Sequence, residues 1–383
     1  MRHRFSVTQT DGLARKGRLE TEHGPIDTPA FMPVGTCGAV KGLTPKDLAA
    51  SGAQVMLANL YHLALRPGID VVERHGGLHE FTGWRGPILT DSGGYQVFSL
   101  AGLRAVDLSG VWFRSHIDGA ELGFTPESVV SDQERMGVDI AMMLDECPPA
   151  TATRSQVQDS LRRTTHWAER ARAAWSEGPT QLFGIAQGGV YEDLREQAVE
   201  ALVALDFPGY AIGGVSVGEP AEDRERIVRC TVPLLPADRP RYLMGVGTPL
   251  DILQAVRQGV DLFDCVLPSR NARHGFLFTR TGPIRIKNAR FREDTAPIDE
   301  GCACRTCATV SRAFVHHLIR SGELTGTVLA TLHNVRFFLD FARDLGEAIA
   351  SGKVAEWGGS FTASYTSSDL GETLLGSEQP QPD

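Results

Sequence analysis

The chain has 383 residues, of which 42% are hydrophobic and 22% are charged, and this balance excludes a generally disordered protein. No stretch approaches 18 consecutive apolar residues, which excludes a membrane-spanning helix on hydropathy. The net charge of −9 argues against nucleic-acid binding over the whole surface, because phosphates require concentrated lysine and arginine.

Eight short apolar runs are separated by longer amphipathic segments. The runs cover residues 30–34, 54–60, 87–90, 138–144, 181–186, 210–215, 241–246 and 260–267. Nearly continuous apolar runs of this length indicate parallel strands that are buried on both faces. Their alternation with helices favours an α/β fold of the (β/α)8 TIM-barrel type, with a doubly wound open sheet as the alternative.

Helical signals stand between several of these runs. Residues 44–52, 125–137 and 248–259 each begin with Thr-Pro, carry an acid in the first turn and end on glycine. Threonine caps a helix, proline fits its first position and glycine stops it, so each segment predicts a complete helix. A further amphipathic helix is expected over residues 190–205.

The alternation stops after Cys265, and two helical patterns follow at 311–321 and 326–350. We expect a barrel core over residues 1–275 that is closed by a helix from 326–350. Residues 276–325 are expected to form a zinc-binding subdomain. Residues 357–383 predict a polar, partly disordered tail, above all in the last seven residues.

Three of the seven cysteines lie within six residues, at Cys302, Cys304 and Cys307. Such clustering favours a metal site in a reducing compartment over a disulfide framework. The N-terminus is basic without an apolar core behind it, so we expect a cytoplasmic protein. One imidazole would complete a closed structural Zn²⁺ site, and the spacing leaves three candidates for it: His316, His317 and His333.

Polar residues follow the predicted strands at the ends where barrel enzymes carry their catalytic groups. They are Asp91, Asp145, Gln187, the pair Gly213-Gly214, and Asp264. Two carboxylates can share a displacement at an anomeric carbon, one as the nucleophile and the other as the acid/base. A third carboxylate, an amide and an accessible glycine backbone suit the edge of a purine. The residues therefore predict an enzyme that acts on the glycosidic bond of a sugar or nucleoside.

One segment departs from the acidic average. Residues 265–292 contain seven basic side chains and no acidic one. A solvated basic face is the usual meaning of such a run. This run begins directly after Asp264, and this position favours contact with a substrate over a solvated face.

Several motifs, taken together and in order, resemble the queuine tRNA-ribosyltransferases, also called tRNA-guanine transglycosylases. They are DSGGYQ (91–96), FRSHIDG (113–119), LDEC (144–147), AQGG (186–189), GGVSVGEP (213–220), GVGTP (245–249), FDCVLPSRNARHG (263–275), and CACRTC (302–307) with a later histidine. The set covers nearly the whole chain.

The resemblance implies a (β/α)8 barrel with a zinc-bearing insertion, and exchange of the wobble guanine of GUN-anticodon tRNA for a 7-deazaguanine base. It implies that Asp264 attacks C1′ of the ribose and that Asp91 is the general acid/base. It selects His333 as the fourth zinc ligand, and it implies a homodimer. The implied base-binding residues are Ser92, Gly93, Gly94, Tyr95, Asp145, Gln187, Gly213 and Gly214. The implied tRNA-binding residues are Gly245, Val246, Gly247, Thr248, Pro249, Leu250, Asp251, Ser269, Arg270, Asn271, Ala272 and Arg273.

Small departures from the motifs bear on the incoming base. The motif LDEC, with Cys147, resembles that of bacterial members that use 7-aminomethyl-7-deazaguanine (preQ1). Val217 would restrict the space for the larger ring of queuine. Three residues depart from the usual motifs: Ser216, Ser269 and His274. We therefore expect preQ1. The alternatives are a queuine-using salvage enzyme, a non-catalytic tRNA-binding subunit, a metal-dependent barrel hydrolase and a carbohydrate glycosidase. The presence of both Asp264 and Asp91 speaks against the non-catalytic subunit.

Overall fold

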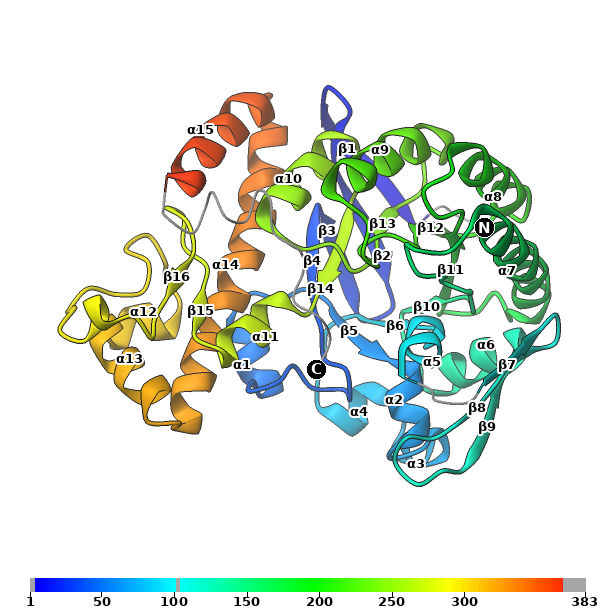
Figure 1. Ribbon diagram of the computed structural model, residues 1–383, viewed down its shortest axis with the longest axis horizontal. Helices are drawn as coiled ribbons and strands as arrows, with labels where there is room; N and C mark the ends of the chain where they lie inside the picture. Colours follow the sequence, from blue (N-terminus) through cyan, green and yellow to red (C-terminus); the bar gives the residue numbers. More distant parts are fainter. Residues whose placement is uncertain (1–3, 101–103, 368–383) are drawn as a thin grey trace.

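The centre of the computed structural model, which describes residues 4–100 and 104–367, is a sheet of eight parallel strands in the order β4-β14-β13-β12-β11-β10-β6-β5. A bridge between Val34 and Leu57 joins the two ends of this order, so the sheet closes into a barrel (Figure 1). The TIM-barrel prediction is confirmed, because each strand falls on one of the eight apolar runs: β4 (Ala30–Pro33), β5 (Met56–Asn59), β6 (Ile88–Asp91), β10 (Ile140–Met142), β11 (Gln181–Ala186), β12 (Gly209–Ile212), β13 (Arg241–Leu243) and β14 (Leu262–Cys265).

The three helices predicted from their Thr-Pro starts and glycine ends begin and end as expected. Thr44, Thr125 and Thr248 each accept a hydrogen bond from a backbone N–H in the first turn of the helix they cap. No helix in the described ranges is long and apolar enough to cross a membrane. The helices up to the end of the barrel are α1 (Pro45–Ala50), α2 (Leu60–Leu65), α3 (Ile69–Arg74), α4 (Leu78–Thr82), α5 (Gly94–Leu100), α6 (Pro126–Arg135), α7 (Arg154–Ala174), α8 (Glu192–Ala204), α9 (Ala221–Thr231), α10 (Pro249–Arg257) and α11 (Leu267–Arg273).

Two three-stranded antiparallel sheets accompany the barrel in the described residues, and the sequence patterns did not predict them. One precedes the first barrel strand, and the other lies between β6 and β10. Their strands are mostly exposed on one face and lack a continuous apolar run, so they give a weak hydrophobic signal. These strands are β1 (Phe5–Asp11), β2 (Ala14–Thr21), β3 (Gly24–Thr28), β7 (Arg104–Asp107), β8 (Gly110–Arg114) and β9 (Glu121–Phe124).

The segment after the barrel strands has a small hydrophobic core of its own, which includes Leu277, Ile286, Phe291 and Val315. Helix α14 packs against β4 of the barrel and also against α12 and α13, so it lies between the barrel and this segment (Figure 1). The elements are β15 (Phe276–Leu277), β16 (Ile284–Arg285), α12 (Arg305–Thr309), α13 (Arg312–Arg320) and α14 (Leu324–Ala350). The two helical patterns predicted at 311–321 and 326–350 are confirmed.

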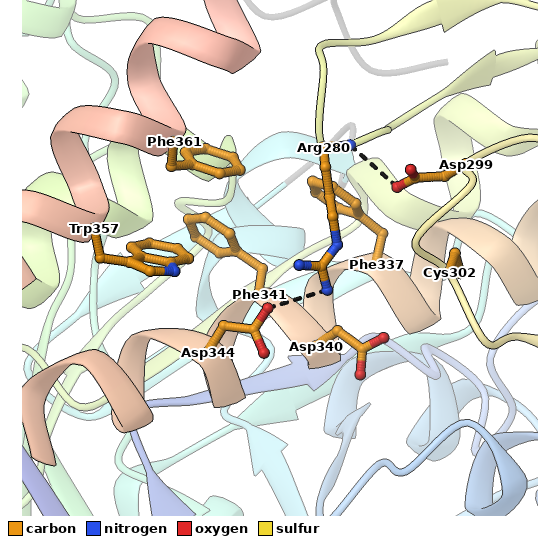
Figure 2. Close-up of a pocket in the computed structure, with 9 residues that line it drawn as sticks. All are labelled: Arg280, Asp299, Cys302, Phe337, Asp340, Phe341, Asp344, Trp357 and Phe361. Atoms are coloured by element: carbon orange, nitrogen blue, oxygen red, sulfur yellow. Dashed lines mark hydrogen bonds and ion pairs between the residues drawn. The ribbon is translucent and has the colours of Figure 1, made fainter. Parts of the chain in front are cut away.

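At its start, the tail expected from residue 357 is a partly apolar helix and not a polar, irregular segment. Helix α15 (Val354–Thr366) runs through it, because Trp357, Phe361 and Tyr365 recur every four residues and form an apolar stripe. Phe361 packs against Phe341 of α14 with ring centroids 4.7 Å apart (Figure 2). The last seven residues, for which disorder was predicted, lie outside the described residues.

Candidate active site and metal centre

Asp264 lies in β14 and is held by two donors to the same oxygen. The hydroxyl of Tyr242, from the neighbouring strand β13, donates to Oδ1 at 2.6 Å. The backbone N–H of Gly245 donates to Oδ1 at 2.7 Å. Burial raises the pKa of Asp264, while these two donors favour its charged form. Because both donors bind Oδ1, the arrangement fixes the carboxylate through one of its two oxygens.

Asp91 lies at the end of β6 and is fixed by amide donors. Asn59, at the end of the adjacent strand β5, donates from Nδ2 to Oδ2 of Asp91 at 2.6 Å. Gln96 donates to the same oxygen at 3.3 Å. Burial and the negative charge of Asp264 raise the pKa of Asp91 to about 7. A carboxyl group with such a pKa can both give and take a proton near neutral pH.

Asp91 and Asp264 occupy the same end of the barrel. In the closed sheet, β6 and β14 are separated by β4 and β5. Their side chains lie at the C-terminal ends of these strands. The negative charge of Asp264 raises the pKa of Asp91 more than the charge of Asp145 does. The structure thus brings together the two carboxylates that the sequence paired.

A second group of polar side chains lies beside them. The carboxylate of Asp145, which follows β10, accepts a hydrogen bond from Gln187 Nε2 at 2.6 Å and from Ser92 Oγ at 3.2 Å. Burial raises the pKa of Asp145 to about 6, against the two hydrogen bonds, which lower it. Oε1 of Gln187 is buried without a hydrogen-bond partner among the described residues. Asp145, Gln187 and Ser92 therefore form one buried polar cluster with hydrogen-bonding capacity to spare.

Glycines allow the backbone to approach this cluster closely. A Cβ atom on Gly94 would lie 2.5 Å from the carbonyl oxygen of Asp145, and one on Gly214 would lie 2.4 Å from Oε1 of Gln187. Gly214 also has a φ of 62°, in the left-handed region where glycine is least strained. The side chain of Arg195 in α8 is fully buried and donates to the carbonyl oxygens of Gly189, Gly213 and Gly214. This arginine holds the two glycine turns together beneath the cluster.

The loop after Gly214 is held by an acid that the sequence analysis did not single out. Glu219 accepts hydrogen bonds from the backbone N–H groups of Ser216 and Val217. Ser216 has a φ of 64°, which is uncommon for a residue other than glycine. Glu219 is buried, and Arg224 lies 3.7 Å from its carboxylate. The carboxylate thus stabilises a strained turn next to the polar cluster.

Tyr95 is the exposed aromatic residue of the site, with 46% of its surface accessible. It lies in the first turn of α5. Burial and the Cys147 thiol raise the pKa of Tyr95, and the charge of Arg270 lowers it. Tyr95 therefore has Cys147 and, from the basic segment 265–292, Arg270 as neighbours, and its ring is accessible to a ligand.

The two segments expected to contact tRNA differ in what they expose. In the first, Gly245 contacts Asp264, whereas Val246 and Pro249 are buried and Thr248 and Asp251 cap α10. A Cβ on Gly247 would collide with the side chain of Cys265. Leu250 packs against the core.

The second segment lies in α11. Ser269 and Ala272 are buried, while Arg270, Asn271 and Arg273 are partly exposed. The basic side chains of this helix follow Asp264 directly in the chain. The second segment therefore offers basic side chains to a substrate, which the first segment lacks.

Cys302, Cys304, Cys307 and His333 converge on one point, with one ligand atom of each lying within 4.8 Å of the others. Nδ1 of His333 is 3.3 Å from Sγ of Cys307 and 3.8 Å from Sγ of Cys304. Nε2 of His333 lies 2.7 Å from the carbonyl oxygen of Phe278, the contact that usually orients a metal-binding imidazole. Hydrogen bonds from the neighbouring thiols lower the pKa of Cys304.

The geometry decides among the three candidate histidines. His316 instead has Nδ1 at 2.7 Å from the carbonyl oxygen of Ile286, and the metal-ligand group contains His333 rather than His316 or His317. Three sulfurs and one ring nitrogen at these separations are compatible with a tetrahedral zinc site.

Asn59, Tyr242, Arg195 and Glu219 were missed by sequence reasoning. Asn59 ends the apolar run 54–60 and could have been found as another polar residue at a strand end. The other three give no such signal. Tyr242 fits an apolar run, Arg195 fits an amphipathic helix and Glu219 fits a turn, so the local sequence does not mark any of them as a functional residue.

Comparisons with known proteins show the family of the chain. The family model described as "Queuine tRNA-ribosyltransferase" matches residues 10–367. A protein of that name from Desulforudis audaxviator is 56% identical over 349 residues, covering 90% of this chain and 94% of the relative. Those from Oleidesulfovibrio alaskensis and Thiobacillus denitrificans are 53% and 52% identical, covering 94% of this chain and 96% and 98% of the relatives. The chain belongs to the queuine tRNA-ribosyltransferase family.

Proposed function

We propose that this enzyme exchanges the wobble guanine of GUN-anticodon tRNA for preQ1 through a covalent intermediate on Asp264. The observation that carries the proposal is the meeting of Asp264 and Asp91 at one end of the barrel, beside a buried cluster suited to a purine edge. A base that is turned out of the RNA stack can enter such a site.

The proposed reaction has two displacements at C1′ of the ribose. In the first, the carboxylate of Asp264 attacks C1′, the C1′–N9 bond breaks, and protonated Asp91 gives its proton to the departing guanine. In the second, Asp91 takes the N9 proton of the incoming base, N9 attacks C1′, and the ester bond to Asp264 breaks. Atoms and charges balance over the cycle, and the RNA backbone stays intact.

The polar cluster would recognise the base that is exchanged. The carboxylate of Asp145 can accept hydrogen bonds from purine N–H groups, and the amide of Gln187 can donate to the purine carbonyl oxygen. Tyr95 would stack on the ring. Arg270 and Arg273 would contact phosphates next to the flipped nucleotide.

The four metal-binding residues would hold a structural Zn²⁺ ion through Cys302, Cys304, Cys307 and His333. Such an ion stabilises the fold around it and has no open position for substrate. We also propose that the enzyme works in the cytoplasm. We further propose that it is a homodimer, and sedimentation of the purified chain would test this oligomeric state.

Radiolabelled guanine exchange tests the proposal. Asp264→Asn should bind tRNA but neither exchange guanine nor leave a protein–RNA adduct on a denaturing gel. Asp223→Asn, a change at a partly exposed position in α9, is the matched control and should retain both. Unchanged exchange in Asp264→Asn would remove the mechanism, and a wild-type chain that binds tRNA without exchange would be a non-catalytic subunit.

Competition identifies the incoming base. preQ1 should displace labelled guanine from the enzyme at concentrations where queuine does not, because the side chain of Val217 would restrict the space for the larger ring of queuine. Equal competition by queuine would support the salvage enzyme instead.

A further inference from the structure

A second group of potential metal ligands lies at the other end of the barrel from Asp91 and Asp264. His23 comes from the turn between β2 and β3, His79 from α4, and Asp139 directly precedes β10. One ligand atom of each lies within 4.8 Å of the others. The proposed tRNA chemistry uses none of these residues.

Asp139 is fully buried. Its Oδ1 accepts from the backbone N–H of His23 at 3.0 Å, and its Oδ2 accepts from the backbone N–H of Ile88 at 2.9 Å. The carboxylate is therefore held rigidly between two histidine side chains.

His79 has the orientation of a metal ligand. Its Nδ1 lies 3.2 Å from the carbonyl oxygen of Trp84, so Nδ1 carries a proton and donates it. Its Nε2 then faces Asp139 Oδ2 at 3.2 Å, yet this buried atom has no hydrogen-bond partner among the described residues. An imidazole whose other nitrogen donates to a backbone carbonyl is the usual arrangement around a metal ion.

A lone pair on Nε2 next to a carboxylate oxygen is repulsive unless a cation lies between them. The 3.2 Å between Nε2 of His79 and Oδ2 of Asp139 is near the ~3.3 Å ligand spacing of tetrahedral zinc with bonds of about 2.0–2.1 Å. Nδ1 of His23 lies 3.1 Å from Asp139 Oδ1, close enough to join the site after a side-chain rotation.

We propose that His23, His79 and Asp139 bind a divalent transition-metal ion such as Zn²⁺, with water as the remaining ligand. The ring of His23 is stacked on that of His79, with centroids 3.5 Å apart, so binding must turn it out of the stack. His23 can turn, because 35% of its side chain is exposed, and the same exposure admits water. The ion would cross-link the β2–β3 turn to the base of the barrel.

The test counts metal ions in the full-length chain. The reduced protein is stripped with a chelator, titrated with Co²⁺, and its bound metal is measured after gel filtration. The thiolate site gives an intense near-ultraviolet sulfur-to-cobalt band, whereas a nitrogen–oxygen site gives only weak visible bands. We expect wild type to bind one Co²⁺ ion more than the thiolate site accounts for.

His23→Ala should lose that additional ion and keep the sulfur-to-cobalt band, and His79→Gln should do the same. His75→Ala, which removes another histidine near α4, should keep the additional ion. Wild type that binds only the thiolate ion would overturn the proposal. An additional ion that persists in both His23→Ala and His79→Gln would also overturn it, because that ion would lie elsewhere.

Discussion

The two ends of strand β10 carry buried aspartates that differ in their partners. Asp139, before the strand, accepts two backbone N–H groups and lies beside two histidines, and these neighbours lower its pKa to about 2. Asp145, after the strand, has Gln187 and Ser92 as donors, and burial raises its pKa to about 6. Two buried carboxylates therefore shift in opposite directions, and the surrounding donors decide the sign.

The opposite shifts have opposite effects on stability. The folded-state pKa of Asp139 lies below the ordinary value of 3.8, so its contribution is present above pH 3.8 and is lost as pH falls through about 2. The pKa of Asp145 lies above that value, so ionising it costs stability increasingly from about pH 3.8 to 6. The end of the barrel with Asp139 stabilises its carboxylate, whereas the end with Asp145 keeps hydrogen-bonding capacity for a ligand.

Exchanging each aspartate for asparagine separates the two ends. Asp145→Asn should lower kcat/KM for guanine exchange by about 10³-fold, because its amide would present N–H to the N–H groups of the purine. Gln187 can turn its amide to bond the new side chain, so the free energy of unfolding should not fall. Exchange assays and urea denaturation measure both quantities. A destabilised Asp145→Asn with normal exchange would reverse our assignment.

Asp139→Asn should do the opposite. Asparagine has one carbonyl oxygen, so it cannot accept from both Ile88 and His23, and one buried backbone N–H loses its partner. We expect the free energy of unfolding to fall by about 3 kcal/mol, measured by urea denaturation of chelator-treated protein. Exchange by the folded fraction should be unchanged; a loss of exchange as large as that of Asp145→Asn would show that the two ends are not independent.

The sequence predicted the active end of the barrel better than the other end. Continuous apolar runs define parallel strands, and the C-terminal ends of those strands must meet, so Asp91, Asp145 and Asp264 could be grouped from the order of residues alone. Tyr242 could not be found in this way. Its role depends on the register between β13 and β14, which no local pattern encodes.

The cluster at the base of the barrel was also invisible in the sequence. His79 and Asp139 are 60 positions apart, and His23 comes from a sheet that the apolar pattern did not predict. Each residue alone is an ordinary turn or helix residue. Contacts of this kind depend on how whole elements pack, whereas the thiolate cluster was recognisable because three of its ligands are close in sequence.

The pH dependence sharpens the contrast at Asp91. The proposed first step needs Asp91 protonated and Asp264 ionised, and the pKa of Asp91 is raised to about 7. We expect kcat/KM for tRNA to fall about tenfold per pH unit above pH 7. Asp91→Asn should have low activity without this decline, as measured by exchange between pH 5.5 and 9. A wild-type profile that stays flat to pH 9 would exclude Asp91 as the acid.

The smallest change we expect to resolve is Tyr242→Phe. Tyr242 donates to Asp264 Oδ1 at 2.6 Å, and burial together with the Asp264 charge raises the pKa of Tyr242 well above its ordinary value, so its hydroxyl keeps the proton. Removing the hydroxyl should raise the pKa of Asp264 and slow exchange about tenfold, which corresponds to the free energy of one hydrogen bond to a charged group. Tyr210→Phe, equally buried on the adjacent strand β12, should exchange normally.

If Tyr242 acts by positioning Asp264 and favouring its anion, the effect of Tyr242→Phe on kcat/KM should depend on pH. Because Asp264 reacts as the anion, a higher pKa moves the rising limb of kcat/KM to higher pH, so the deficit of Tyr242→Phe should shrink as pH increases toward 7. A packing defect would instead lower the rate by the same factor at every pH. Gly245 still donates to Oδ1 in this variant, which is why the loss should stop near tenfold and leave the covalent adduct detectable.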